Sequence, residues 1–180
     1  MTPKKAKPSL SSKTKNPQIV FETTMGNIRL ELFSDKAPIT VANFLRYVDA
    51  KFYDGTLFHR VIADFMIQGG GFNIGMEHKE NDPPIKNEAG NGISNTRGTV
   101  AMARTQVVDS ATSEFFINLI DNTYLNHSND TPNGYGYCVF GRVVEGMEIV
   151  DKIAKVPTHS FQCFQDVPET DIIINTIQQI

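Results

Sequence analysis

FHRVIADFMIQGGGF, residues 58–72, sets one arginine among large apolar side chains and has three consecutive glycines near its end. Arg60 carries five hydrogen-bond donors in one plane, and the amide of Gln68 both donates and accepts hydrogen bonds. A cation on an apolar wall is costly unless it is paired or used. On residue types alone, a surface ion pair for Arg60 and ordinary turns at the glycines are the simpler interpretation, so the rest of the chain has to decide.

The same stretch is predicted to form two short strands, with glycines that permit a bulge or a close turn. Because successive side chains of a strand point to opposite faces, Phe58, Arg60 and Ile62 are expected to point one way. Met66 and Gln68 are likewise expected to share a face. The stretch contains no nucleophile motif and no metal-ligand cluster, so its chemistry would rely on hydrogen bonds and apolar contact.

Alternating apolar residues elsewhere predict further short strands, and only two segments have helical spacing. Val41, Phe44, Leu45 and Val48 lie at helical spacing after a proline suited to a first turn, and a second helix is expected near residues 146–155. This pattern predicts an antiparallel barrel or sandwich. The predicted strands cover residues 19–21, 28–32, 57–62, 65–68, 99–103, 115–118, 137–143 and 172–177.

Composition and charge are those of one ordinary globular domain. The chain has 180 residues, of which 40% are hydrophobic and 21% charged. Residues 1–16 hold five lysines and no acidic residue, so we expect a basic, disordered tail without the apolar core of a signal peptide. Residues 17–180 then carry a net charge of −8, because the whole chain carries −3. We therefore expect no nucleic-acid binding by the folded part and no membrane span.

Cysteine and histidine give no sign of a disulfide, metal or cofactor site. Cys138 and Cys163 lack CxxC spacing, and we expect free thiols in a cytoplasmic protein, with Cys138 in the core and Cys163 exposed. The four histidines are scattered without metal-ligand spacing. The three glycines lack the spacing of a phosphate-binding loop. Long polar connections at residues 75–96, 105–112 and 126–136 are expected to be functional or mobile.

The opening stretch resembles the signature of the cyclophilins, the cyclosporin-binding peptidyl-prolyl cis-trans isomerases. GTVAM from Gly98, SATSEFFIN from Ser110 and YCVFGRVVEGMEIV from Tyr137 extend this resemblance over most of residues 18–180. The pattern resembles bacterial single-domain cyclophilins most. The resemblance implies an all-β fold, mainly antiparallel: an eight-stranded closed β-barrel capped by two α-helices, formed by residues 17–180.

The resemblance also implies a site. In the family, the arginine that aligns with Arg60 donates a hydrogen bond to the twisting prolyl amide, so Arg60 is the expected catalytic residue. No cofactor and no metal are implied. The residues expected to bind substrate are Phe65, Met66, Gln68, Ala103, Arg104, Glu114, Phe116, Tyr124, Leu125 and Tyr137.

Four of these positions depart from the usual family pattern. Glu114 stands where relatives have glutamine, and near Arg60 it would either orient the guanidinium or compete with substrate, with a modest effect on activity. Tyr124 stands where many relatives have a tryptophan that contacts cyclosporin, so weakened cyclosporin binding is expected. Tyr137 replaces a histidine at the pocket rim, and Arg104 replaces an asparagine at a position that contributes mainly backbone contacts.

Two function classes follow from these residues. The first is an isomerase that accelerates rotation about Xaa-Pro bonds and assists protein folding. The alternative is a non-catalytic module or chaperone that binds proline-containing segments without turning them over. The expected partners are proline-containing peptides and unfolded or folding proteins, and the expected state is a monomer.

Overall fold

The computed structural model describes residues 15–180. The expected basic tail therefore lies outside the described residues except for its last two. Asn16 already contacts the barrel, since its side-chain amide donates to Glu31 Oε1 at 3.2 Å. Over the described range, none of the helices has the length and apolar character needed to cross a membrane.

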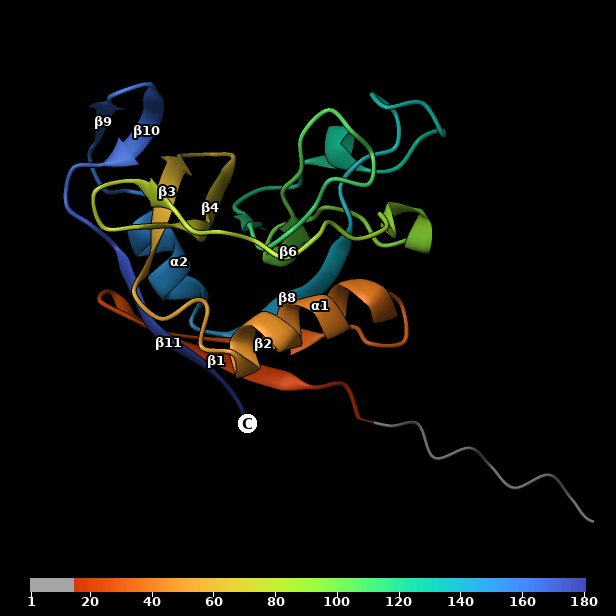
Figure 1. Ribbon diagram of the computed structural model, residues 1–180, viewed down its shortest axis with the longest axis horizontal. Helices are drawn as coiled ribbons and strands as arrows, with labels where there is room; N and C mark the ends of the chain where they lie inside the picture. The colour runs from red at the N-terminus through yellow and green to blue at the C-terminus, as the bar shows by residue number, and fades with distance from the viewer. Residues whose placement is uncertain (1–14) are drawn as a thin grey trace, which may run out of the picture.

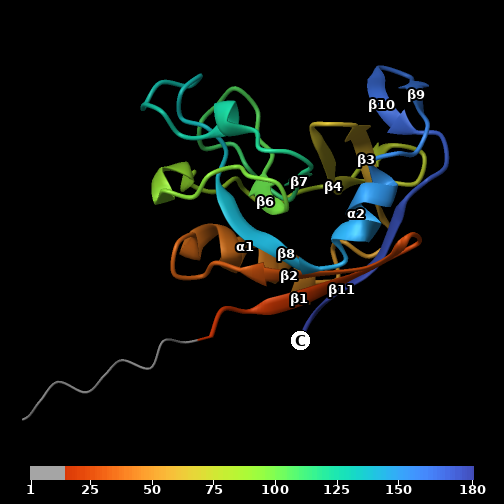
Figure 2. The same ribbon diagram turned by 180° about the vertical axis from the view of Figure 1, so that it is seen from behind.

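Eight antiparallel strands form a closed barrel, as predicted. Along the ring they follow the order β3, β11, β1, β2, β8, β6, β7, β4, and pairing of β4 with β3 closes it (Figures 1 and 2). The ring therefore decides between barrel and sandwich in favour of the barrel. The strands are β1 (Gln18–Thr23), β2 (Gly26–Leu32), β3 (Thr56–Ile62), β4 (Met66–Asn73), β6 (Thr99–Met102), β7 (Phe115–Asn118), β8 (Val139–Glu145) and β11 (Ile173–Gln179).

Three further strands were not predicted. β5 (Glu77–His78) adds two residues to the edge of β4, inside a segment expected to be a loop. β9 (Thr158–Phe161) and β10 (Phe164–Pro168) form a separate hairpin, at the upper left of Figure 1. Cys163 lies in the turn of this hairpin and is exposed, as expected. Two short 3₁₀ helices, η1 (Ala89–Asn91) and η2 (Thr123–Leu125), lie in the long connections.

The two predicted helices are present, and they lie apart from each other in both views (Figures 1 and 2). α1 (Pro38–Asp49) begins at the proline expected in its first turn, and α2 (Met147–Ile153) follows β8. Glu88, far along the chain, caps α1: its Oε1 accepts from the backbone N–H of Thr40 at 2.7 Å and from its hydroxyl at 2.8 Å. A carboxylate at this end also suits the helix dipole.

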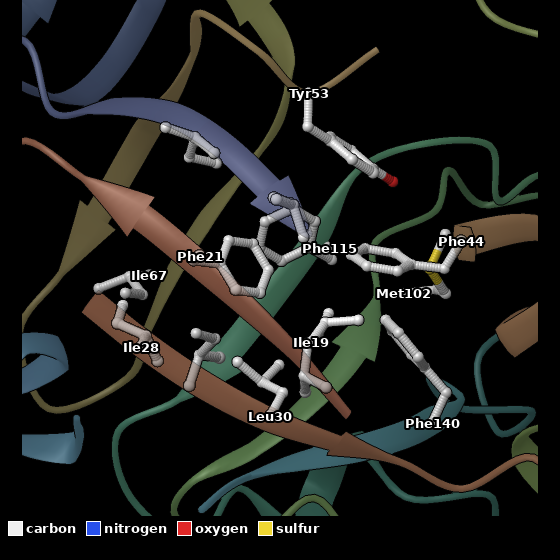
Figure 3. Close-up of a cluster of buried hydrophobic side chains, with 14 of the residues drawn as sticks. Ile19, Phe21, Ile28, Leu30, Phe44, Tyr53, Ile67, Met102, Phe115 and Phe140 are labelled. Atoms are coloured by element: carbon white, nitrogen blue, oxygen red, sulfur yellow. The ribbon is translucent and has the colours of Figure 1, made fainter. Parts of the chain in front are cut away.

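Aromatic side chains fill the barrel interior. The ring of Phe115 lies 5.4 Å from that of Phe21 and 5.7 Å from that of Phe44, with centroid distances typical of aromatic packing. Figure 3 shows these three rings pointing toward one another from different elements. Tyr53 adds a fourth ring, and its hydroxyl donates to the carbonyl of Ser113 at 2.8 Å. Burial raises the pKa of Tyr53 well above its usual value, so it stays neutral in this core.

One expectation about β3 is wrong. Phe58 does not share a face with Arg60: it packs in the barrel interior, whereas Arg60 lies on the outer face. The cause is a β-bulge. Phe58 pairs with Gly69 and Arg60 pairs with Gln68, so two steps along β3 correspond to one step along β4. The extra residue, His59, shifts the alternation by one. The predicted shared face of Met66 and Gln68 is confirmed.

The strands on one side of the barrel are buried on both faces. In β7, Phe115 packs in the interior and Phe116 packs in a second apolar cluster outside it; Met102 and Ala101 of β6 divide in the same way. Residues of the long connections, among them Ile93 and Leu125, pack on this outer cluster, and the connections drawn in green to cyan lie on the side away from the β9–β10 hairpin (Figures 1 and 2). A continuous run of apolar residues such as FFI therefore indicates a strand that is buried on both faces.

Candidate active site

A pocket opens on this outer face of the barrel. Its volume is about 170 Å³, below the roughly 300–1,000 Å³ of sites for drug-sized ligands, so it suits one small ring rather than a large ligand. Nine of the eleven site residues expected from the sequence line it. These are Arg60, Phe65, Met66, Gln68, Ala103, Arg104, Phe116, Leu125 and Tyr137.

The apolar wall comes from segments far apart in the chain. Met66 on β4 and Phe116 on β7 are 2% and 5% exposed, and Leu125 in η2 packs against them. The Phe116 ring meets the edge of Tyr137 at 5.8 Å between centroids. These contacts give the pocket a buried apolar floor with a phenol at its rim.

The polar wall consists of Arg60 and Gln68, which pair directly across β3 and β4. Arg60 Nη1 donates to Gln68 Oε1 at 3.2 Å. The guanidinium is partly exposed at the mouth of an apolar pocket. It can therefore donate its remaining N–H groups to a bound molecule.

Arg104 holds the pocket rim with its side chain. Its guanidinium donates to three backbone carbonyls: Gly136 at 3.0 Å, Pro132 at 3.0 Å and Thr105 at 2.9 Å. Its Cζ also lies 4.9 Å from the centroid of the Tyr137 ring, within the range of a cation–π contact. The side chain thus ties the connection over residues 126–136 to the end of β6, beyond the backbone contacts expected of this position.

Buried asparagines position the apolar wall, and none of them was predicted as a site residue. Asn118 donates to Asn95 Oδ1 at 3.2 Å, and Asn122 donates to Asn118 Oδ1 at 2.9 Å. Asn122 also donates to the carbonyl of Phe65 at 2.9 Å, and Asn95 donates to that of Leu125 at 3.2 Å. All three asparagines are 0% exposed. A signal in the sequence is Asn118 at the end of an apolar strand, where a buried polar group needs partners.

Glu114 does not line this pocket but a neighbouring one, which shares Gln68, Ala103 and Arg104 with it. Its Oε2 accepts from Gln68 Nε2 at 3.3 Å, and the described residues include no ion pair between Glu114 and Arg60. Burial raises the pKa of this carboxyl, while His78, the hydrogen bond from Gln68 and the charge of Arg60 act in the opposite direction. Gln68 therefore bridges Glu114 and Arg60 by hydrogen bonds.

His59, the bulge residue, lies near the other carboxylate oxygen of Glu114. Its Nε2 lies 3.7 Å from Glu114 Oε1, a pair that would be ionic only if the ring were protonated. Burial, helped by the charges of Arg60 and His78, lowers the pKa of His59 from 6.5 to about 4. At neutral pH the ring is uncharged, so it does not neutralise the carboxylate.

Tyr124 also lies outside the lining. It is 71% exposed in η2, and its ring contacts Phe65 with centroids 6.2 Å apart. The phenol therefore extends the apolar surface beside the pocket. Among residues 15–180, no group of three or more histidine, cysteine or acidic side chains is placed to hold a metal ion.

The family profile described as "Cyclophilin type peptidyl-prolyl cis-trans isomerase/CLD" matches residues 18–179. The chain belongs to the cyclophilin family. It is 55% identical over 159 residues to peptidyl-prolyl cis-trans isomerase B of Escherichia coli, covering 88% of this cyclophilin and 97% of that protein. It is 53% identical to a peptidyl-prolyl cis-trans isomerase of Acinetobacter baylyi, covering 91% of this chain and 85% of the relative.

Solved structures agree with this assignment. A crystal structure of a Cryptosporidium parvum cyclophilin type peptidyl-prolyl cis-trans isomerase matches with a TM-score of 0.76 at 25% identity, over 92% of this cyclophilin and 98% of that chain. A second crystal structure of that protein was obtained in the presence of the dipeptide Ala-Pro. It matches with a TM-score of 0.73 at 26% identity, over 89% of this cyclophilin and 96% of that chain. This cyclophilin is accordingly an enzyme, a peptidyl-prolyl cis-trans isomerase, as the sequence predicted.

Proposed function

We propose that this cyclophilin binds proline-containing peptides in the pocket described above and that Arg60 is the catalytic donor. The proline ring would enter the apolar wall of Phe65, Met66, Phe116 and Leu125, while Gln68 and the backbone around residue 103 hold the peptide. The observation that carries this proposal is the guanidinium of Arg60, which lines a small pocket with an apolar wall and keeps N–H groups free beyond its hydrogen bond to Gln68. The Ala-Pro dipeptide of the Cryptosporidium parvum structure supports the ligand class.

The reaction needs no covalent intermediate. Rotation about a prolyl bond must break amide resonance, against a barrier of roughly 18–20 kcal/mol. In the twisted state the nitrogen becomes pyramidal and gains a lone pair. A donor aimed at that nitrogen, or at the displaced carbonyl oxygen, binds the twisted state better than either planar isomer, and only such differential binding accelerates the step.

Arg60 and the pocket would each account for part of the rate acceleration. A hydrogen bond from a charged donor contributes about 1.5–3 kcal/mol, which is one to two powers of ten in rate. Further acceleration has to come from holding the proline ring in a dry site with fixed dipoles, where electrostatic stabilisation is stronger than in water.

Replacing Arg60 with alanine is therefore expected to lower kcat/KM about tenfold to a hundredfold on a short Ala-Pro peptide, measured by NMR exchange. Arg29→Ala is the matched control, because Arg29 lies on β2 and pairs with Glu145 at 2.9 Å, away from the pocket. Equal exchange rates for wild type and Arg60→Ala would remove Arg60 from catalysis. Peptide binding without exchange in the wild type would favour a binding module.

Cyclosporin is expected to inhibit this enzyme only weakly. Tyr124 presents a phenol where many relatives have an indole N–H, and the chain contains no tryptophan. Tyr124→Trp should tighten inhibition about tenfold, the value of roughly one hydrogen bond. The measurement is the inhibition constant in the exchange assay with both proteins. Nanomolar inhibition of the wild type would contradict the expectation.

We further propose that residues 17–180 act as one monomeric isomerase domain that assists protein folding in the cytoplasm. Cys138 and Cys163 support the compartment, since both are free thiols. Burial raises the pKa of Cys138 to about 11, so this thiol is inert core rather than a redox site.

A further inference from the structure

We propose that Glu114 is a positioning residue: its carboxylate fixes the side-chain amide of Gln68 so that the amide oxygen faces Arg60 and holds the guanidinium at the pocket mouth. The inference rests on the proposed catalytic role of Arg60. It assigns to Glu114 an indirect role, in place of a contact with substrate.

The hydrogen-bond chemistry allows only one orientation of Gln68. Arg60 can only donate and an ionised Glu114 can only accept, so the amide between them must turn its oxygen to Arg60 and its nitrogen to Glu114. The distances agree, at 3.2 Å from Arg60 Nη1 to Oε1 and 3.3 Å from Nε2 to Glu114 Oε2. The strand register supports this line of contacts, because Gln68 pairs with Arg60 on one side and with Phe116 on the other.

The backbone leaves room for the carboxylate in this position. A Cβ added at Gly71 would lie only 2.6 Å from Glu114 Cγ, closer than real Cβ contacts. Any larger residue at position 71 would therefore displace the side chain of Glu114. The carboxylate is held between Gly71, Gln68 and His59, and 24% of its side chain is exposed.

The surroundings keep Glu114 sensitive to pH. Burial raises the pKa of its carboxyl, so protonation begins at a higher pH than for an exposed glutamate. His59 remains neutral down to a pH of about 4 and supplies no compensating charge above it. The charged or titratable groups around Glu114 are Arg60 and His59 of β3, His78 of β5, Arg104 after β6, and the buried Tyr53.

Protonation changes what Glu114 offers to Gln68. A neutral carboxyl carries an O–H donor, so it also accommodates the reversed amide, in which the oxygen of Gln68 faces Glu114 and the nitrogen faces Arg60. The amide nitrogen of Gln68 and the guanidinium of Arg60 then face each other. Because both groups are donors, the hydrogen bond between them is lost. Even without reversal, the hydrogen bond loses its charge and about half its strength. The guanidinium is thus held most firmly when Glu114 is ionised.

The test compares Glu114→Gln with Glu114→Ala by NMR exchange on an Ala-Pro peptide at pH 7.5 and pH 5. We expect Glu114→Ala to lower kcat/KM about tenfold at pH 7.5, and Glu114→Gln to restore it to within about threefold of wild type, because glutamine still accepts from Gln68. The kcat/KM of wild type should fall on going to pH 5, whereas that of Glu114→Gln should stay constant. Glu80→Gln, at an exposed site after β5, is the control.

A second measurement follows the contact itself. The side-chain amide signals of Gln68 and the Nε–H signal of Arg60 should shift together as pH falls in wild type and stay fixed in Glu114→Gln. Parallel pH profiles of wild type and Glu114→Gln, or static signals in both, would overturn the inference. If Arg60→Ala is fully active, the proposed catalytic role of Arg60 is wrong. The NMR signals of Gln68 and Arg60 in the unmodified protein still decide whether Glu114 positions these two side chains. The variant His78→Asn tests whether the nearby ring of His78, and not Glu114, causes the shift of these two NMR signals with pH.

Discussion

Replacing Phe115 with alanine should lower the free energy of unfolding by about 3–5 kcal/mol. The side chain is 0% exposed and lies at the centre of the interior cluster, against Phe21, Phe44, Tyr53 and Phe58. Four other rings from three parts of the chain cannot all move inward, so a cavity would remain. Urea denaturation of both proteins at pH 7 measures the difference.

Phe116→Ala is the matched comparison, one residue along the same strand. Phe116 faces the pocket on the outer side of β7, where its removal opens the site instead of the interior. We expect a smaller loss of stability than for Phe115→Ala but a larger loss of kcat/KM at equal folded fraction. If both variants lost stability and activity in the same proportion, the division of β7 between an interior face and a pocket face would be incorrect.

Acidification from pH 7 to pH 5 should cost wild type about 2 kcal/mol of stability through His59 alone. The pKa of this histidine is lowered to about 4 in the folded protein, chiefly by burial, from 6.5 when unfolded. The unfolded chain therefore binds a proton that the folded protein does not. The contribution of His59 is fully present above pH 6.5 and is lost as the pH falls toward 4.

Urea denaturation of wild type and His59→Gln at pH 7 and pH 5 isolates this effect, since other titrating groups such as Glu114 are common to both. Wild type should lose about 2 kcal/mol more than the variant on acidification. His159→Gln, at an exposed position in β9, should behave like wild type. A direct NMR titration that placed the His59 ring near 6.5 would contradict the prediction even if the variant folded poorly.

The fold was largely predictable, because eight strands and two helices carry clear alternating or helical spacing. The bulge at His59 was not, since nothing in FHRV shows that Phe58 and Arg60 leave the strand on opposite faces. The β9–β10 hairpin was missed for a different reason. Its turn places Gln162 at φ 53°, a conformation usually given to glycine, asparagine or aspartate, so the segment lacked a turn signal.

The site could be predicted only in part from residue types. Arg60, Phe65, Met66 and Gln68 are close in sequence, but nothing in their spacing joins them to Phe116 or Leu125, and only the family resemblance did so. The hydrogen bonds that support the pocket could be predicted neither from residue spacing nor from the family resemblance. Asparagines that resemble ordinary turn residues are buried behind the pocket, because their neighbours in space come from connections far apart in the chain.

The closed ring of strands has a consequence for an enzyme that handles extended peptides. An open sheet offers unpaired backbone groups along its edge, and a segment of another chain can pair there and aggregate. In the described part of this chain, all eight barrel strands have a partner on both sides. Only β5, with two residues, and the hairpin strands β9 and β10, with four and five, keep an edge. Extended peptides therefore find only short strand edges on this domain with which to pair.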